Sequence, residues 1–386
     1  MIFDHSLHPS VLDQPEHQAE ALAALSEHAA QLTSAAPKAA AVAANQVQIP
    51  LTTVSSLGNF DATIFIRFRG MPSAANPVPL MVDSGNTVLI VPSWESIAAL
   101  PNAAATYQVL GQAQAPFGCP ANVVRGPIDL VTSTGAPFTL ANCVFYACTA
   151  NNSDGKRTAN FGAGNISPWS ASGWNTPQNL GVTVRSPLAY SSLPYAVIDY
   201  AAATTVVNPS QAPTVAGGSS LTLYATRPTG FRMFDILRNR FIMSVKARSL
   251  TIGTTKTAWP GALPSPIAMV DTGGGPVLLS DPNQAISTTP WPPAAQNPDW
   301  TNDGQSIACE STAAALTVEL GDSEVSYSYR IDPARLPPLD NRPTLVMCRQ
   351  NEFLRGMNGM NIGGISALMN SILIDYANTQ VGFKPK

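Results

Sequence analysis

The sequence predicts a mostly β protein with two lobes, preceded by a short helical extension. The chain has 386 residues, which is long enough for more than one compact core. It contains 34 prolines and 27 glycines and only 12% charged residues, a composition that favours short strands and turns over long surface helices. Two segments about half the chain length apart nearly repeat each other, Met81–Gly85 and Met269–Gly273. The repeat indicates that one structural unit occurs twice.

Residues 1–48 differ in composition from the rest and predict one amphipathic helix from about residue 14 to residue 33. Asp13 and Glu16 have the spacing of a helix start, and Pro37 marks the end. Between them, four apolar residues lie at helical spacing: Leu22, Leu25, Ala29 and Leu32. This helix either packs on the body of the protein or serves as a prosegment or lid.

Strands dominate the pattern from residue 49 onward. The segment Thr63–Gly70 alternates, with Ile64, Ile66 and Phe68 on one face and two arginines on the other, which predicts a half-buried strand. Similar runs separated by turn residues continue to the end of the chain. Few helices are evident, and Ser366–Ser371 is one candidate.

Each repeated segment places an aspartate between two apolar runs. Asp83 precedes Val88–Val91, and Asp271 precedes Val277–Leu279. An aspartate in such a place is costly to bury unless its carboxylate is paired with another group or takes part in the function of the protein. Two of them in a duplicated unit indicate that two carboxylates are brought to one site.

Several classes of function are disfavoured by what the body of the chain lacks. All four histidines lie within the first 28 residues, so a Ser-His or Cys-His pair would need its base from the extension. The five cysteines are scattered without any Cys-x-x-Cys, which argues against a metal site. A net charge of −3 argues against nucleic-acid binding. Proton chemistry in the body therefore falls chiefly to carboxylates, and we expect neither a metal nor a cofactor.

No stretch of the chain has the pattern of a membrane span, because the long uncharged stretch 201–226 is broken by Pro209, Pro213 and two glycines. The N-terminus lacks a basic region followed by an apolar one, so no secretory signal is visible. These features favour a cytoplasmic protein, although a secreted protein with a trimmed leader would look the same.

The repeated segments resemble the two active-site segments of the pepsin-like aspartic proteases. Leu80–Ser93 is similar to the first of these segments, and Ala268–Gly273 is similar to the second. Three further segments follow the order of the family, namely its two apolar-Gly segments and its closing strands, at Phe161–Gly164, Asn361–Gly364 and Ile372–Phe383. The resemblance covers nearly all of residues 50–386. It implies a bilobal fold with an N-terminal lobe of residues 49–205, a C-terminal lobe of residues 206–386 and a cleft between them.

The resemblance also assigns roles to the residues of the repeated segments. Asp83 and Asp271 would form a catalytic dyad that shares one proton and holds a water, because two like charges so close cannot both ionise cheaply. The hydroxyl groups of the next residues would tie the two loops together, and the following glycines would let backbone N–H groups approach the carboxylates. These supporting residues are Ser84, Gly85, Thr272 and Gly273.

This chain departs from the family pattern at the residue after each motif. Asn86 and Gly274 stand where the family usually has Ser or Thr in contact with the carboxylates, and only Asn86 can donate a hydrogen bond from its side chain. The flap hairpin of the family corresponds to Phe117-Gly118-Cys119, with Phe117 in the place of a tyrosine. The hydrogen bond of the tyrosine hydroxyl is then lost.

Cys309 and Cys348 fall where the family has the disulfide of its second lobe. The resemblance implies that these two residues lie within bridging distance, even if the compartment keeps them reduced. The state of the other three cysteines stays open.

The function that these features predict is an aspartic endopeptidase that hydrolyses peptide bonds. Two alternatives stay open: an enzyme of the same fold that uses the acid–base pair on a small non-peptide molecule, and a non-catalytic binding or inhibitory protein. Retention of both aspartates favours an enzyme, whereas the changes at Phe117, Asn86 and Gly274 favour the alternatives. In each case we expect a monomer with a peptide or small molecule in the cleft between the lobes, and no nucleic-acid or membrane partner.

Overall fold

The computed structural model describes most of the chain from Gln46 onward and shows a mostly β protein, as the composition predicts. The described residues are 46–53, 62–153, 155–166, 173–200, 219–235, 243–258, 266–274, 277–280, 301–302, 305–306, 309–312, 314–332, 345–348 and 359–386. The expected helix of residues 14–33 lies outside these ranges. None of the helices within them is long and apolar enough to span a membrane.

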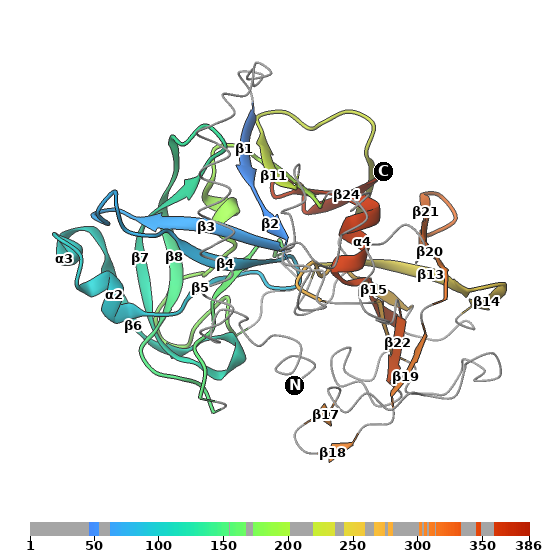
Figure 1. Ribbon diagram of the computed structural model, residues 1–386, viewed down its shortest axis with the longest axis horizontal. Helices are drawn as coiled ribbons and strands as arrows, with labels where there is room; N and C mark the ends of the chain where they lie inside the picture. Colours follow the sequence, from blue (N-terminus) through green and yellow to red (C-terminus); the bar gives the residue numbers. More distant parts are fainter. Residues whose placement is uncertain are drawn as a thin grey trace, which may run out of the picture.

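An eight-stranded sheet is formed by the first part of the chain and lies on the left of Figure 1. Its strand order is β2 (Thr52–Thr53), β3 (Ala62–Phe68), β4 (Val78–Asp83), β9 (Asn160–Gly162), β5 (Leu89–Val91), β8 (Pro137–Cys148), β7 (Pro120–Val131) and β6 (Gln108–Gln114). Strand β3 also pairs with β7. The predicted strand is confirmed in β3, where Ile64, Ile66 and Phe68 are buried.

A nine-stranded sheet is formed by the second part of the chain and lies on the right of Figure 1. Its order is β19 (Cys309–Thr312), β22 (Leu345–Cys348), β16 (Val277–Ser280), β23 (Gly359–Asn361), β15 (Ile267–Met269), β13 (Ser244–Ile252), β20 (Leu316–Gly321) and β21 (Ser326–Ile331), with β14 (Thr255–Ala258) paired to β13. A separate short ladder joins β17 (Thr301–Asn302) and β18 (Gln305–Ser306).

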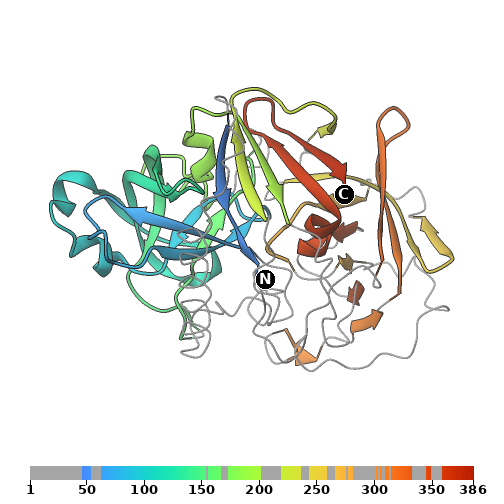
Figure 2. The same cartoon turned by 45° about the horizontal axis from the view of Figure 1, so that its top comes forward.

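A six-stranded sheet lies above and between these two and contains strands from both parts of the chain (Figure 2). Its order is β1 (Gln46–Pro50), β11 (Ser220–Tyr224), β10 (Tyr195–Asp199), β24 (Asn370–Asp375), β25 (Gln380–Pro385) and β12 (Arg232–Asp235). This sheet therefore crosses the expected lobe boundary at residues 205 and 206. Its first strand begins at Gln46, inside the expected extension.

The two larger sheets repeat one local arrangement. In the first, β4 runs parallel to β9, and β9 pairs antiparallel with β5. In the second, β15 runs parallel to β23, and β23 pairs antiparallel with β16. The register also repeats, since Asn160 lies opposite Met81 and Asn361 lies opposite Met269, in each case two residues before the aspartate. The duplication expected from the sequence is thus present in the backbone.

Short helices occur at the edges and in the middle of these sheets. They are α2 (Trp94–Ala98), α3 (Ala103–Thr106), α4 (Gly363–Met369) and the 3-10 turns η3 (Pro116–Gly118) and η4 (Pro187–Tyr190). Helix α4 is buried along its whole length. The predicted helix at Ser366–Ser371 is only partly right, because the helix begins earlier and strand β24 starts at Asn370. A main apolar core runs through both halves and includes residues of all three large sheets.

Candidate active site

The two repeated loops meet at the centre of the molecule. Asp83 ends strand β4, and Asp271 follows strand β15 by two residues. A Cβ atom built on Gly85 would lie 2.5 Å from Cγ of Asp271, and one built on Gly273 would lie 2.7 Å from Cγ of Asp83. Each glycine therefore packs against the aspartate of the other loop. The side chain of any larger residue at either position would clash with that aspartate.

The hydroxyl groups of Ser84 and Thr272 link the two loops, as the sequence predicts. Ser84 Oγ accepts a hydrogen bond from Thr272 N at 2.9 Å and donates to the carbonyl of Val270 at 2.8 Å. Thr272 Oγ1 accepts from Ser84 N at 3.0 Å and donates to the carbonyl of Val82 at 3.1 Å. Both hydroxyls are fully buried, so this symmetrical set of four bonds fixes one loop against the other.

The carboxyl groups of Asp83 and Asp271 are almost completely buried, with 4% and 7% of their surface exposed. Asp83 Oδ1 accepts from Gly85 N at 2.7 Å and from Asn86 N at 3.1 Å. Asp271 Oδ1 accepts from Gly273 N at 3.0 Å. Both Oδ1 atoms are thus bound by the backbone of their own loops, which is the role expected for the glycines.

The second oxygen of each carboxyl group is bound by an asparagine whose role the sequence does not predict, although Asn361 belongs to the second apolar-Gly segment. Asn160 Nδ2 donates to Asp83 Oδ2 at 2.8 Å, and Asn361 Nδ2 donates to Asp271 Oδ2 at 2.7 Å. Both amides are buried. One signal could have revealed them: Asn, an apolar residue and Gly occur together in each half, at Asn160–Gly162 and at Asn361–Gly363.

At the positions after the repeated motifs, the side chain of Asn86 and the lack of one at Gly274 act on these amides rather than on the carboxylates. Asn86 binds one amide through its side chain, and Gly274 leaves space for the other. Asn86 Nδ2 donates to Asn160 Oδ1 at 2.8 Å, so the hydrogen bond that this side chain can donate goes to an amide rather than to a carboxylate. A Cβ atom on Gly274 would lie 2.9 Å from Asn361 Nδ2 and 3.2 Å from Asp271 Oδ2. The missing side chain at Gly274 thus leaves room for the amide of Asn361.

The pKa of Asp271 is raised well above its ordinary value. Burial is the main cause, and the charge and hydrogen bond of the neighbouring Asp83 carboxyl add to it. The hydrogen bonds from Asn361 and Gly273 act in the opposite direction and favour the ionised form. The pair is therefore arranged so that Asp271 holds a proton under conditions in which an exposed aspartate has lost it.

The apolar-Gly segment of the first half packs directly beneath the first loop. Gly162 N donates to the carbonyl of Val88 at 3.0 Å, and Gly164 N donates to that of Asn86 at 2.9 Å. A Cβ atom on Gly162 would lie 2.2 Å from the carbonyl oxygen of Val88. Only glycine fits there, because any side chain would push the loop away from strand β9.

Two further buried residues hold the loops, and no pattern in the sequence marks either of them. Asn175 Nδ2 donates to Thr87 Oγ1 at 2.9 Å and to the carbonyl of Val184 at 2.9 Å. The hydroxyl of Tyr200 donates to the carbonyl of Thr272 at 3.5 Å. The contacts with Thr87 and Thr272 join residues that are 88 and 72 positions apart in the sequence.

The predicted flap residues form the tip of the hairpin between β6 and β7. Phe117 adopts a left-handed backbone conformation with a φ of 66°, and its carbonyl accepts from Asn152 Nδ2 at 3.3 Å. Cys119 is fully buried, and its sulfur accepts from Thr158 N at 3.4 Å. These contacts bind the tip to the segment 152–158, with Gly118 at the turn. A position of this tip over the carboxylates stays a prediction.

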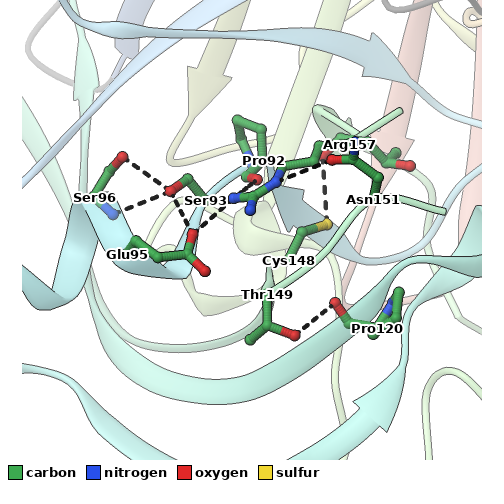
Figure 3. A network of polar contacts seen from close by, with 10 residues as sticks. Pro92, Ser93, Glu95, Ser96, Pro120, Cys148, Thr149, Asn151 and Arg157 are labelled. Carbon is green, nitrogen blue, oxygen red and sulfur yellow. Dashed lines mark hydrogen bonds and ion pairs between the residues drawn. The ribbon is translucent and has the colours of Figure 1, made fainter. Parts of the chain in front are cut away.

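The segment that the tip of the hairpin contacts is held by a polar network, which Figure 3 shows. Arg157 donates from Nη1 to Glu95 at 2.7 Å and to the carbonyl of Pro92 at 3.2 Å, and from Nε to Asn151 at 3.3 Å. The hydrogen bond from Arg157 is the largest cause of a lowered pKa at Glu95. The network anchors Asn151 and Arg157 to Pro92 and helix α2, and so supports the segment that the tip of the hairpin contacts.

The backbone places Cys309 directly opposite Cys348 in the antiparallel pair of β19 and β22. Opposed residues in such a pair have Cα atoms roughly 4.5–5.5 Å apart, within the range of about 4.4–6.8 Å that a disulfide spans. The disulfide itself stays a prediction. Cys119, Cys143 and Cys148 are buried free thiols.

Within the described ranges, no cluster of three or more His, Cys, Asp or Glu side chains is placed to hold a metal ion. The chemistry of the centre is that of two facing carboxyl groups surrounded by uncharged donors. No protein-family model matches this chain, and no curated protein shows significant similarity to it.

Proposed function

We propose that this protein is an aspartic endopeptidase of the pepsin-like, bilobal type, and that Asp83 and Asp271 activate the attacking water. One observation carries the proposal. Two buried carboxyl groups from duplicated loops face each other, and each receives hydrogen bonds on both oxygens. No structural role requires two acids to be buried side by side, since burial of like charges is costly.

The chemistry follows from the unequal state of the two carboxyl groups. The raised pKa of Asp271 makes it the member that holds the proton, and Asp83 is the member that we assign to accept the proton of the water. A water between them gives its proton to the ionised carboxylate as it attacks the peptide carbonyl carbon. The protonated carboxyl donates its proton to the carbonyl oxygen. As the C–N bond breaks, the leaving amine takes the proton that the other carboxyl received from the water, and a hydroxyl of the tetrahedral intermediate returns a proton to Asp271.

The bilobal form is supported by the duplication of the sheets and of their register. Asp83 belongs to the eight-stranded sheet and Asp271 to the nine-stranded sheet, so the pair lies where the two halves meet. An extended peptide lying between two such halves would present its backbone to both carboxyl groups. The substrate class is therefore an unfolded or extended peptide.

The test is incubation of the protein with a denatured protein substrate at several pH values, with and without a pepstatin-type inhibitor. We expect cleavage that the inhibitor blocks and that declines as the pH rises through the raised pKa of the pair. Asp83→Asn and Asp271→Asn should each lower the rate by at least about 10²-fold, because each removes one partner of the acid–base pair. Glu324→Gln, which changes an exposed carboxylate on a turn, is the matched control and should cleave as the unaltered protein does.

Each other outcome of this assay counts against the proposal. Inhibitor binding without cleavage would favour a binding or inhibitory protein. Cleavage that either Asn variant retains would remove the pair from the mechanism. A rate that still rises from about pH 6 to about pH 8 would require a different acid–base group.

A further inference from the structure

The two buried asparagines have equivalent places in the two halves of the molecule. Asn160 lies on β9 opposite Met81, and Asn361 lies on β23 opposite Met269. Each donates its amide N–H to Oδ2 of the aspartate of its own half, at 2.8 Å and 2.7 Å. The same contact is thus built twice from segments that are distant in the sequence.

The orientation of each amide is fixed by a second hydrogen bond. Asn160 Oδ1 accepts from Asn86 Nδ2 at 2.8 Å, and Asn86 Oδ1 in turn accepts from Val88 N at 3.2 Å. Asn361 Oδ1 accepts from Gly363 N at 2.8 Å. Because the oxygen of each amide is already bound to a donor, its NH₂ group must point to the carboxylate.

We propose that Asn160 and Asn361 are positioning residues, which hold the plane of each carboxyl group and stabilise the ionised form of the carboxyl group to which each donates. The proposal rests on the catalytic role proposed for Asp83 and Asp271. The backbone binds each Oδ1 atom and the amide binds each Oδ2 atom, so neither carboxyl group can rotate without losing a hydrogen bond. Hydrogen bonds that a charged group accepts are stronger than neutral ones.

Around Asp271, the groups that stabilise the ionised carboxyl are uncharged donors. Among the described residues, the charged group that acts on Asp271 is the Asp83 carboxyl, which opposes its ionisation. The groups that favour its ionisation are the amide of Asn361 and the N–H of Gly273. Removal of the Asn361 amide therefore leaves one donor against burial and a like charge.

The arrangement also accounts for both unusual residues after the repeated motifs. Asn86 orients the amide of Asn160, and Gly274 leaves the space that the amide of Asn361 occupies. The two halves thus make the same amide–carboxylate hydrogen bond, one with the help of the Asn86 side chain and the other with the space at Gly274. The changes at Asn86 and Gly274 therefore do not leave the carboxylates without donors.

The test is the ¹³C NMR titration of the Asp271 carboxyl carbon, assigned by its loss in Asp271→Asn. Asn361→Leu should move the midpoint to higher pH, because the lost hydrogen bond favoured the ionised form. Asn370→Leu is the matched control, since Asn370 is equally buried but bonds to Ser366 and Tyr327. It should lower the urea midpoint of unfolding without moving the carboxyl titration.

Turnover gives a second readout from the other half. Asn160→Leu should lower kcat about tenfold or more with little change in KM, because the buried amide acts on the carboxyl group and not on substrate binding in this account. The Asn160→Leu variant still tests the proposal if Asn361→Leu does not fold. Circular dichroism checks the folding of both variants. An Asp271 titration that is unmoved in Asn361→Leu, or a kcat that is unchanged in Asn160→Leu, would overturn the proposal. The NMR result stands whether or not the protein cleaves peptides, so it separates this proposal from the proposed activity.

Discussion

Asp83 and Asp271 are each surrounded by donors that belong to their own half of the chain. Isolated charges of this kind would be strongly disfavoured in an apolar interior, and hydrogen bonds on both oxygens are what makes their burial tolerable. The donors are neutral, so they do not cancel the repulsion between the two carboxylates. Asp271 consequently retains a proton in the folded protein.

The raised pKa of Asp271 predicts how its contribution to stability depends on pH. The folded state binds this proton more tightly than the unfolded chain, in which an aspartate titrates near ~3.9. The contribution is therefore fully present below that pH and is lost as the pH rises through the folded pKa. Asp271→Asn should abolish this loss, so the variant gains stability relative to the unaltered protein as the pH rises from about 4 to about 7.

Urea unfolding at a series of pH values measures this directly. The difference in free energy of unfolding between Asp271→Asn and the unaltered protein should grow with pH. Glu324→Gln supplies the control for an exposed carboxylate. A difference that is constant with pH would show that Asp271 titrates normally in the folded state.

The residue scale is also where sequence reasoning reached its limit. Asp83 and Asp271 could be predicted, because an aspartate between apolar runs is unusual and the pattern occurs twice. The contact of Asn160 could not, because the Asn-apolar-Gly pattern that it shares with Asn361 marks the residue but does not name its partner. Its partner is set by the parallel pairing of β4 with β9, which joins residues 77 apart. No local pattern contains that information.

At the scale of elements, the two loops are held together by the hydroxyl groups of Ser84 and Thr272. Each hydroxyl satisfies one N–H and one carbonyl of the opposite loop, all of them buried. The loops therefore keep their mutual position without any charged contact. The distance between the two carboxyl groups depends on this link.

Ser84→Ala should destabilise the protein far more than its size suggests. It leaves Thr272 N and the carbonyl of Val270 without their partner. An unsatisfied buried polar group costs about 1–3 kcal/mol, so we expect the free energy of unfolding to fall by at least about 2 kcal/mol. Ser328→Ala, on the exposed face of β21, should change it by less than about 0.5 kcal/mol. Equal effects of the two variants in urea unfolding would contradict this account of the link.

Helix α4 shows why element type was predicted less well than element position. The run Ile365–Ile374 is apolar almost throughout, and periodicity alone does not distinguish a buried helix from a buried strand in such a run. The chain uses it for both, with α4 ending at Met369 and β24 starting at Asn370. The closing strands expected at Ile372–Phe383, in contrast, are present as β24 and β25, which pair antiparallel.

At the scale of the whole molecule, the six-stranded sheet joins the two halves (Figure 2). Strand β24 from the end of the chain pairs with β10, and the turn after it also contacts the first half. Asn165 Nδ2 donates to the carbonyl of Asp375 at 3.1 Å, and Tyr376 N donates to the carbonyl of Pro194 at 3.1 Å. The sequence could not predict this sheet, because its neighbours in space are distant along the chain.

The Asp375 carboxylate stabilises that turn, and its pH dependence should have the opposite sign to that of Asp271. Burial alone would raise its pKa, but hydrogen bonds from Asn378 and from Arg227 outweigh burial and lower it. Its contribution is therefore present above ~3.9 and is lost as the pH falls through the folded pKa. Asp375→Ala should lower the free energy of unfolding by at least about 2 kcal/mol near neutral pH and by much less in acid.

The same urea experiments check this prediction, with Glu324→Ala as the control for loss of an exposed carboxylate. A deficit of Asp375→Ala that is as large in acid as at neutral pH would mean that the carboxylate does not carry the stabilisation. Its ion pair with Arg227 Nη2, at 2.7 Å, would then contribute little to the stability of the sheet that connects the two halves.

The central claim is that Asp83 and Asp271 form one coupled pair, and the NMR titration of Asp271 in Asp83→Asn tests it most directly. The carboxyl group of Asp83 is one cause of the raised pKa of Asp271, so its replacement by a neutral amide removes a like charge. The account predicts that the midpoint of the Asp271 carboxyl carbon falls in Asp83→Asn relative to the unaltered protein. A midpoint that does not move would show that the two carboxyl groups titrate independently, and the pair would not exist.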